Sequence, residues 1–488
     1  MKLDKARIFK VGIAFVIVML FWEVYDFAVP ILLDRTYGLS ATWRGFIMGL
    51  DNILAIVFLP LFGSFSDKYK GKIFGRRTPF IVIGTLLAGI LVMLLIAIEN
   101  TEFNKLVDEG VKSIDTLVSK GYLDSKYLDP IYKTITEDNA LFEQFSIDFH
   151  AAQVKMALAN TVSNPTSIVL FIIVLFVLLV TMSSFRAPVV ALMPDVTIKP
   201  LRSGANAIMN FMGGIGGFIS IGLYSLFAPD YGSFVLLFLL LVTFMYMLLA
   251  GYMLLVNENK FVGLRYQEEK KWNVVDEEEV CGEEKLSKPK LISLLLILAA
   301  IFFWFMGYNA VRSHLSVYVT DKLLMAASGV GLINFANGLG GALALIPVGF
   351  MSGKIGRKKS TLIGFALASI AFFPCLFVTA KTSYVVGICF VLAGIGLIIV
   401  NVNTLPMVCE MSKGSNVGKY TGYYYVASMS AQAVAPFFAG LFMDKIGDNI
   451  MFAFASVSII IAFIVMLFVK HGDNKPTKEE IKSNIMDI

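Results

Sequence analysis

Charged residues inside hydrophobic segments are the residues of this sequence best placed to do chemistry. Glu23 and Asp26 stand three apart in one apolar segment, and Asp51 stands in the next. Residues three apart share a helix face, and a rise of about 1.5 Å per residue puts the three carboxyls at a similar depth. A charge at mid-bilayer costs roughly 2.5–3.5 kcal/mol. We therefore predict a substrate and proton site here, the alternative being acids that only pair with neighbours or line a mouth.

A deep arginine and several amides extend this polar set. Arg186 lies nine residues before Asp195, which places it roughly 13 Å inside the membrane boundary. It is expected to face an acid or a substrate, unless it snorkels to the surface. Donor and acceptor groups that suit a hydroxyl-rich ligand occur at Asn206, Asn210, Tyr308, Asn309, Asn337 and Asn401. Each amide alone also fits a hydrogen bond that joins two helices.

The composition predicts helices that cross a membrane many times. Of 488 residues, 57% are hydrophobic and 16% are charged, whereas a soluble chain would have roughly a quarter charged. Apolar runs of about 20 residues span a bilayer as helix. The fold class is therefore an all-α membrane protein with twelve transmembrane helices. The predicted spans are 8–33, 43–66, 79–98, 167–193, 203–228, 233–256, 291–317, 326–351, 361–380, 384–409, 419–443 and 449–470.

Polar segments divide these spans into domains. Residues 1–98 and 167–256 form an N-terminal bundle (helices 1–3 and 4–6), and 291–470 form a C-terminal bundle (helices 7–12). Between and after them lie a helical insertion at 99–166, a linker at 257–290 and a tail at 471–488. Lys and Arg concentrate in alternate loops, which puts both termini in the cytoplasm and the insertion outside. The net charge of +5 thus marks a membrane face and does not indicate nucleic-acid binding. The linker is expected to be a solvated tether.

The two bundles repeat one another. The segment Gly63–Lys68 recurs as Gly349–Lys354, and Asp34-Arg35 recurs as Asp321-Lys322. Later in each half, Asp195 corresponds to Glu410. Parallel repeats of this kind rock about a site near the bilayer midplane. We therefore predict two pseudo-symmetric six-helix bundles that work as a transporter by alternating access.

Other classes of function are disfavoured. The four cysteines form no CxxC pair and the three histidines are scattered, so no metal site and no cofactor is expected. A membrane enzyme should carry a nucleophile or a metal cluster in a span, and a sensor should carry a signalling domain. The sequence shows neither, so we expect a protein that is not an enzyme, with a sensor as the less favoured alternative.

Two sequence stretches resemble a known family. Gly63-x-x-Ser-Asp67-Lys68, followed by Gly75-Arg-Arg-x-Pro-Phe-Ile81, resembles the loop between helices 2 and 3 of the major facilitator superfamily. The ending GRRTPFI is similar to the sucrose–proton symporter branch of the glycoside–pentoside–hexuronide cation symporters. The stretch from Ala191 to Asp195, with Arg202 and Ala205-Asn206-Ala207, resembles the helix 4–5 region of that branch.

The resemblance implies a multi-pass cell-membrane protein, expected to be a monomer, that carries a sugar such as sucrose or maltose with protons. Two departures matter. Arg186 stands about one helical turn before the position of the family's helix 4 arginine. Leu59 precedes Pro60, and Ala55 lies a turn away, where sodium symporters of the wider group carry acids. Protons are therefore preferred over sodium. A sodium-coupled glycoside symporter and an exporter of another small polar solute remain alternatives.

The basic loop is predicted to be a cytoplasmic gate. By resemblance, Asp67 lies near the N-terminal end of helix 11 and acts with Arg76 or Arg77 as a latch. Gly353 replaces the acid in the second half, while Lys354 and Arg357 are retained. The latch is therefore predicted to be asymmetric, the alternative being basic residues that only set the topology.

Overall fold

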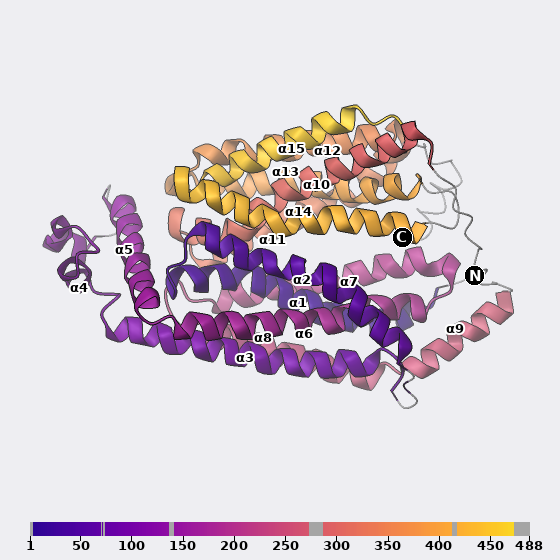
Figure 1. Ribbon diagram of the computed structural model, residues 1–488, viewed down its shortest axis with the longest axis horizontal. Coiled ribbons are helices and arrows are strands. Elements are labelled where there is room, and N and C mark those ends of the chain that lie inside the picture. Colours follow the sequence, from indigo (N-terminus) through magenta and orange to yellow (C-terminus); the bar gives the residue numbers. More distant parts are fainter. Residues whose placement is uncertain are drawn as a thin grey trace. The chain divides into compact units, whose positions relative to one another are not determined.

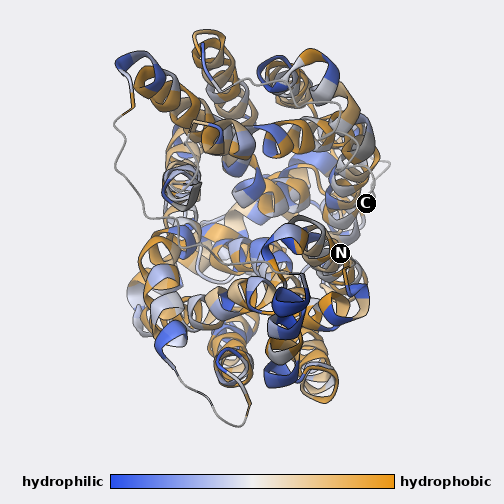
Figure 2. Ribbon diagram, turned by 90° about the vertical axis from the view of Figure 1, so that its right-hand side faces the viewer, coloured by the Kyte–Doolittle hydropathy of each residue, from blue (hydrophilic) through white to orange (hydrophobic). Residues whose placement is uncertain are grey.

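The computed structural model describes residues 3–69, 71, 74–135, 141–272, 286–411 and 417–472. Within these ranges the regular secondary structure is helical, which confirms the all-α prediction. Twelve of the described helices are long and apolar enough to cross a membrane, and hydrophobic colours dominate them in Figure 2. The spans are built on α1 (Lys5–Arg35), α2 (Ala41–Lys68), α3 (Thr78–Asp108), α6 (Thr166–Asp195), α7 (Arg202–Phe227), α8 (Val235–Leu255), α10 (Lys288–Val317), α11 (Ala327–Ile355), α12 (Arg357–Phe372), α13 (Tyr384–Cys409), α14 (Val417–Ile446) and α15 (Ile450–Leu467). The span of α10 continues to Lys322 and that of α12 to Phe377.

The chain forms two compact units. Unit 1 comprises Met1–Arg44, Val57–Val274 and Leu315–Gly331, and unit 2 comprises Gly45–Ile56, Val275–His314 and Leu332–Ile488. In unit 1, α1 packs on α7 and α8, and α3 packs on α6 and α8 (Figure 1). In unit 2, α12 packs on α13 and α15, and α14 contacts both of these helices. Each unit therefore has its own helical core.

Glycines bring helix backbones into contact within each unit. A Cβ atom added to Gly216 of α7 would lie 2.6 Å from the carbonyl oxygen of Val16 in α1. A Cβ atom added to Gly340 of α11 would lie 2.1 Å from the carbonyl oxygen of Val391 in α13. Helices without side chains between them approach closely and gain van der Waals contact. These positions hold α1 against α7 and α11 against α13.

The insertion is a small helical subdomain of unit 1. Helix α3 continues past residue 98, where its span was predicted to end, to Asp108. It is followed by α4 (Ile114–Ser119), η1 (Ser125–Leu128), η2 (Pro130–Lys133) and α5 (Phe142–Ser163). Their apolar side chains share a buried core that includes Leu117, Tyr127 and Met156. Figure 1 shows α4 and α5 at one end of unit 1, opposite α9.

The first part of the linker is folded, unlike the solvated tether expected for 257–290. Helix α9 (Glu258–Trp272) follows α8 almost directly, and its residues Glu258 and Phe261 are buried. Arg7 of α1 donates to both carboxylate oxygens of Glu268 at 2.9 Å. Residues 273–285 of the linker and 473–488 of the tail lie outside the described residues. The linker therefore contributes a helix to unit 1.

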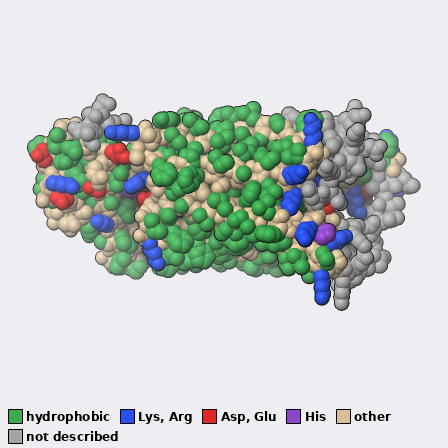
Figure 3. Space-filling model, turned by 90° about the horizontal axis from the view of Figure 1, so that it is seen from above, with side chains coloured by type: hydrophobic (Ala, Val, Ile, Leu, Met, Phe, Trp, Pro, Cys, Tyr) green, Lys and Arg blue, Asp and Glu red, His purple; other side chains and the backbone are tan. Residues whose placement is uncertain are grey.

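Short helices and the molecular surface complete the description. The short helices are η3 (Lys199–Leu201), η4 (Tyr318–Lys322), which is a π-helical turn at the end of α10, η5 (Pro374–Phe377) and η6 (Ala380–Thr382). On the face seen in Figure 3, hydrophobic side chains cover the middle, and the described Lys and Arg side chains lie toward the two ends of that face. This distribution suits helices whose middles contact lipid.

Candidate functional site

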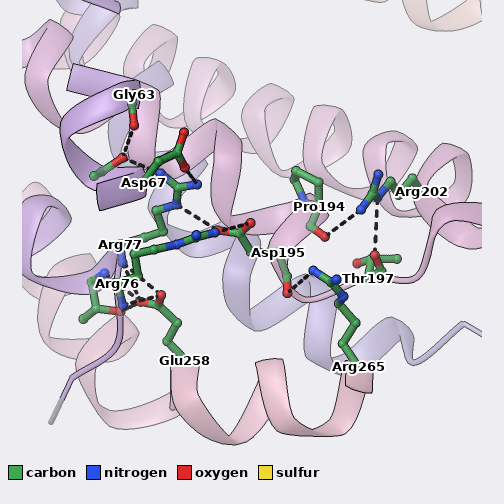
Figure 4. Close-up of polar contacts among 12 residues, drawn as sticks. Gly63, Asp67, Arg76, Arg77, Pro194, Asp195, Thr197, Arg202, Glu258 and Arg265 are labelled. Carbon is green, nitrogen blue, oxygen red and sulfur yellow. Dashed lines mark hydrogen bonds and ion pairs between the residues drawn. The ribbon is translucent and has the colours of Figure 1, made fainter. Parts of the chain in front are cut away.

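An ionic network surrounds Arg77, the residue that precedes α3. Its side chain is 4% exposed. The guanidinium pairs with Asp67 at the end of α2 and donates to the Ser66 hydroxyl. Its Nε atom donates to Asp195 Oδ2 of α6 at 2.8 Å, as Figure 4 shows. One buried cation thus joins the ends of α2 and α6 to the start of α3.

Arg76 binds the other oxygen of the same carboxylate. Its Nη2 atom lies 2.8 Å from Asp195 Oδ1, and its side chain is 41% exposed. Burial alone would lower the pKa of Arg76, but the hydrogen bond and the charge of Asp195 raise it. The predicted gate residues Asp67, Arg76 and Arg77 are therefore brought together, with Asp195 as the acid that both arginines share.

Glu258 of α9 caps the beginning of α3. Its carboxylate accepts hydrogen bonds from the backbone N–H groups of Arg76 (2.7 Å), Arg77 (2.9 Å) and Thr78 (2.8 Å), and from the Thr78 hydroxyl (2.8 Å). An acid at a helix N-terminus satisfies free N–H groups and the positive end of the dipole. Gly75 lies against it with φ +95°, and an added Cβ would be 2.4 Å from Glu258 Cδ. We did not predict this cap; the only signal was an acid directly after the sixth span.

The second repeat contains a corresponding ion pair. Gly356 has φ +93° and precedes α12, just as Gly75 precedes the basic pair before α3. Arg357, the residue after that glycine, pairs with Glu410 at the end of α13. The repeat detected in the sequence therefore extends from residue types to contacts. Lys354 is exposed near the end of α11, and Gly353 follows Ser352 there, where the first repeat has Asp67.

The predicted intramembrane acids are distributed over both units. Glu23 and Asp26 lie half-buried on α1 in unit 1. Asp51 lies half-buried on α2 in unit 2, where its Oδ1 atom accepts from the Nδ2 atom of Asn52 at 2.6 Å. The site that would combine all three acids stays a prediction.

Arg186 meets an aromatic side chain within unit 1. Its Cζ atom lies 5.6 Å from the ring centroid of Trp22. The rings of Trp22 and Tyr25 are 5.4 Å apart in an edge-on arrangement. A guanidinium over the face of an indole gains a cation–π interaction, which is stronger where water is excluded. Arg186 is therefore held beside the helix segment that carries Glu23 and Asp26.

The predicted amides fall into different environments. Tyr308 of α10 donates its hydroxyl to Asn337 Oδ1 of α11 at 2.9 Å, so these two predicted residues are brought together. Asn309 donates to the Phe305 carbonyl oxygen of its own helix at 3.0 Å. Asn401 has a buried Oδ1 atom with no hydrogen-bond donor among the described residues. Asn206 and Asn210 are exposed on α7.

Comparison with known proteins gives one family. The sequence profile described as "Major Facilitator Superfamily" matches residues 151–326 and 316–485. The quinolone resistance protein NorA of Staphylococcus aureus is 27% identical over 177 residues, which are 36% of this chain and 45% of NorA. The uncharacterized MFS-type transporter MJ1317 of Methanocaldococcus jannaschii is 26% identical over 185 residues, 37% of this chain and 45% of that protein. The chain thus spans less than half the length of these curated relatives.

Solved structures with little sequence similarity share the fold. The inward-open xylose transporter XylE from E. coli has a TM-score of 0.61 at 13% identity, covering 98% of this chain and 99% of XylE. A mutant of the nucleoside transporter NupG has a TM-score of 0.60 at 10% identity, covering 96% of this chain and 100% of NupG. At such identities the likeness concerns the arrangement of helices.

Proposed function

The chain belongs to the major facilitator superfamily, and from this premise we propose that it is a secondary active transporter that carries a sugar or glycoside together with protons. It is a multi-pass membrane protein. The proposed orientation has both termini in the cytoplasm and the insertion outside. A membrane potential of 100 mV supplies roughly 2.3 kcal/mol per charge, enough for about fifty-fold accumulation. No resident cofactor is needed for this energy conversion.

The observation that carries the sugar proposal is the composition of the α1 segment around Trp22. An indole ring, a guanidinium 5.6 Å from its centroid and the half-buried carboxyls of Glu23 and Asp26 occur together. Aromatic rings pack on the apolar faces of sugar rings, and carboxylates accept from hydroxyls. The further substrate-binding and proton-binding residues that we propose are Asp51, Arg186, Asn206, Asn210, Tyr308, Asn309, Asn337 and Asn401.

Proton coupling is proposed for two reasons. Carboxyl groups are present in the predicted spans, and α2 lacks the acids that sodium symporters of the resembled group carry before its proline. Asp26 and Asp51 are the proposed proton carriers, since a carboxyl in a desolvated site can exchange a proton with water during the cycle. Leu59 and Ala55 occupy the positions at which sodium symporters of the resembled group carry acids.

The Arg77 network is proposed as part of a cytoplasmic gate. Asp67, which is 57% exposed, is accessible to a partner when the halves move. A carboxylate placed at the N-terminal end of a helix contributes about 0.3–1 kcal/mol, enough to bias a conformational equilibrium while leaving it reversible. Arg357 with Glu410, and the nearby Lys354, would form the weaker counterpart in the second half.

A second candidate function is export of another small polar solute or of a quinolone, which the match to the quinolone resistance protein NorA favours. A sodium-coupled glycoside symporter is a third. Uptake of a panel of labelled sugars into proteoliposomes, measured under an imposed proton or sodium gradient, distinguishes a proton-coupled from a sodium-coupled symporter. Loading the same vesicles with a fluorescent quinolone tests export.

We expect at least one sugar to accumulate with a proton gradient and not with sodium alone. Asp26→Asn should reduce this uptake, whereas Asp115→Asn, a change at a side chain 63% exposed in the insertion, should not. Uptake driven by sodium alone would overturn the coupling. Quinolone export without transport of any sugar would overturn the substrate class, and full activity of Asp26→Asn with Asp51→Asn would overturn the site.

A further inference from the structure

A second ionic cluster, which shares no residue with the Arg77 network, lies at the C-terminal end of α1. Asp34, Arg35 and Arg44 are 4%, 8% and 6% exposed. Arg44 pairs with Asp34, and Arg35 Nη2 lies 2.6 Å from Asp321 Oδ1 of η4. Arg35 also lies over the ring of Tyr231 at 5.6 Å. The two carboxylates and two guanidiniums balance in charge.

His150 adds the insertion to this cluster. Its Nε2 atom is 3.1 Å from Asp34 Oδ2 and 3.1 Å from Asp321 Oδ2. Each aspartate therefore uses one oxygen for an arginine and turns the other toward the same imidazole nitrogen. A single N–H can be donated fully to one acceptor at a time, and Asp321 Oδ2 is buried without a hydrogen-bond donor of good geometry among the described residues. The imidazole thus bridges two helix ends.

The backbone of α5 holds His150 in this position. Gly38, in the turn after α1, has φ +65°, and an added Cβ would lie 2.4 Å from the Leu158 nitrogen of α5. Asn160 of α5 also donates to Glu102 of α3 at 2.6 Å. The insertion helix is therefore seated directly on the turn that follows α1, and the contact of His150 is not that of a loose surface side chain.

The same three side chains could be considered for a cation, because their ligand atoms lie within 4.8 Å of one another. The arginines argue against this use. Arg44 and Arg35 already neutralise the two carboxylates, so a divalent ion would leave the buried cluster with an excess of two positive charges, which is costly away from water. The arrangement fits a contact between protein elements better than it fits a metal site.

We propose that the insertion is a clasp, in which His150 joins the C-terminal end of α1 to η4 and thereby opposes separation of these two ends. Asp34-Arg35 and Asp321-Lys322 end the first spans of the two sequence repeats. The proposed alternating-access cycle requires the first spans of the two repeats to move relative to each other, so that these ends part and rejoin. The role of the clasp in transport rests on the proposed function. The contact of His150 with the two aspartates does not depend on which substrate is carried.

The test measures opening at η4 directly. Val319 is 0% exposed and lies in the same helical turn as Asp321. We therefore place a single cysteine there (Val319→Cys) in a background without the four native cysteines. Its rate of reaction with a maleimide in detergent measures how often this turn separates from α1. His150→Ala should raise this rate about fivefold, the factor that corresponds to about 1 kcal/mol for a hydrogen bond. His150→Gln, which keeps an N–H donor, should give a smaller rise.

Coupling between the partners distinguishes a clasp from general loosening. Asp321→Asn, which also weakens the pair with Arg35, should raise the rate as well. The double variant with His150→Ala should exceed the larger single effect only slightly, because both changes remove the contact between His150 and Asp321. Lys133→Ala, in an exposed pair of the insertion, is the matched control and should leave the rate unchanged.

The clasp is overturned if His150→Ala, folded by circular dichroism, labels at the parent rate, or if the effects of His150→Ala and Asp321→Asn simply add. If His150→Ala does not fold, the same comparison with His150→Gln decides. The labelling assay needs no substrate, so it can fail independently of the transport assay. If the labelling rate depends on His150 but no sugar is transported, the clasp is retained and the proposed substrate is rejected. If a sugar is transported but the labelling rate does not depend on His150, only the clasp is rejected.

Discussion

Arg77 shows how one side chain can organise several helix ends. Its guanidinium reaches Asp67, Asp195 and the Ser66 hydroxyl while its side chain stays 4% exposed. A planar guanidinium has five N–H donors in a fixed fork, whereas a lysine has one compact ammonium. The network therefore depends on the shape of the cation as well as on its charge.

Arg77→Lys is expected to lower both stability and transport. A lysine keeps the charge but cannot reach all three acceptors of the buried guanidinium, and each lost hydrogen bond between charged groups costs about 1.5–3 kcal/mol. Thermal unfolding in detergent measures the loss, with Lys68→Ala, a change at an exposed end of α2, as control. An unchanged unfolding temperature for Arg77→Lys would contradict the role given to the network.

At the scale of elements, the start of α3 depends on a glycine and a distant acid together. Gly75 has a left-handed φ, and an added Cβ would approach Glu258 Oε2 to 2.5 Å. Gly75→Ala is expected to destabilise unit 1 by about 1–3 kcal/mol through backbone strain alone, with more from the displaced cap. Gly214→Ala, on α7 where an added Cβ meets nothing within 4 Å, is the control, and unfolding temperature is the measurement. Equal effects of the two changes would show that Gly75 is not constrained.

A hydrogen bond from the Tyr127 hydroxyl to the Asp148 carboxylate makes the stability of the insertion depend on pH. Burial would raise the pKa of Asp148, but hydrogen bonds from Tyr127 and Gln144 lower it. Burial and the bond to Asp148 raise the pKa of Tyr127. Stability from Asp148 is thus present above about pH 4 and is lost as pH falls through its folded pKa. Stability from Tyr127 is present below about pH 10 and is lost as pH rises through its folded pKa.

Tyr127→Phe should therefore weaken protection of the insertion at neutral pH and reduce its loss in acid. A brief exposure to each pH, followed by a hydrogen-exchange pulse at pH 7 with mass spectrometry, measures protection of the insertion peptides. Tyr132→Phe changes a neighbouring ring, 4.8 Å away, and should keep the parent profile. A Tyr127→Phe profile identical to the parent would exclude the bond as the cause.

At the scale of the whole molecule, most of the fold could be predicted from the hydropathy pattern and the internal repeat. Runs of apolar residues predict spans because a bilayer leaves helix as the simplest way to satisfy the backbone. The repeat aligned Asp195 with Glu410 and kept Arg357 as a counterpart of the basic pair, but the arginines were predicted to act with Asp67; the pairing of Arg76 with Asp195 and of Arg357 with Glu410 is seen only in the structure.

The other partners could not be read from the sequence. Glu258 meets Thr78 across 180 residues, and His150 meets Asp34 across 116. These contacts depend on how α9 and α5 fold back on unit 1, which neither periodicity nor charge counts determine. The insertion was predicted to be helical, but the third span was ended at residue 98, because hydropathy does not show that Glu99 and Glu102 are buried in a continuation of the same helix.

The attachment of α9 has a consequence for how the gene could be divided. Glu258 caps α3, and Glu268 holds Arg7, so residues 258–272 belong with the first half. Two polypeptides separated after Trp272 and co-expressed should reconstitute a functional carrier. A break at 257 places the cap on the wrong fragment and should lower the yield of assembled protein, as co-purification of the two pieces would show. Equal recovery from both breaks would mean that α9 is dispensable for assembly.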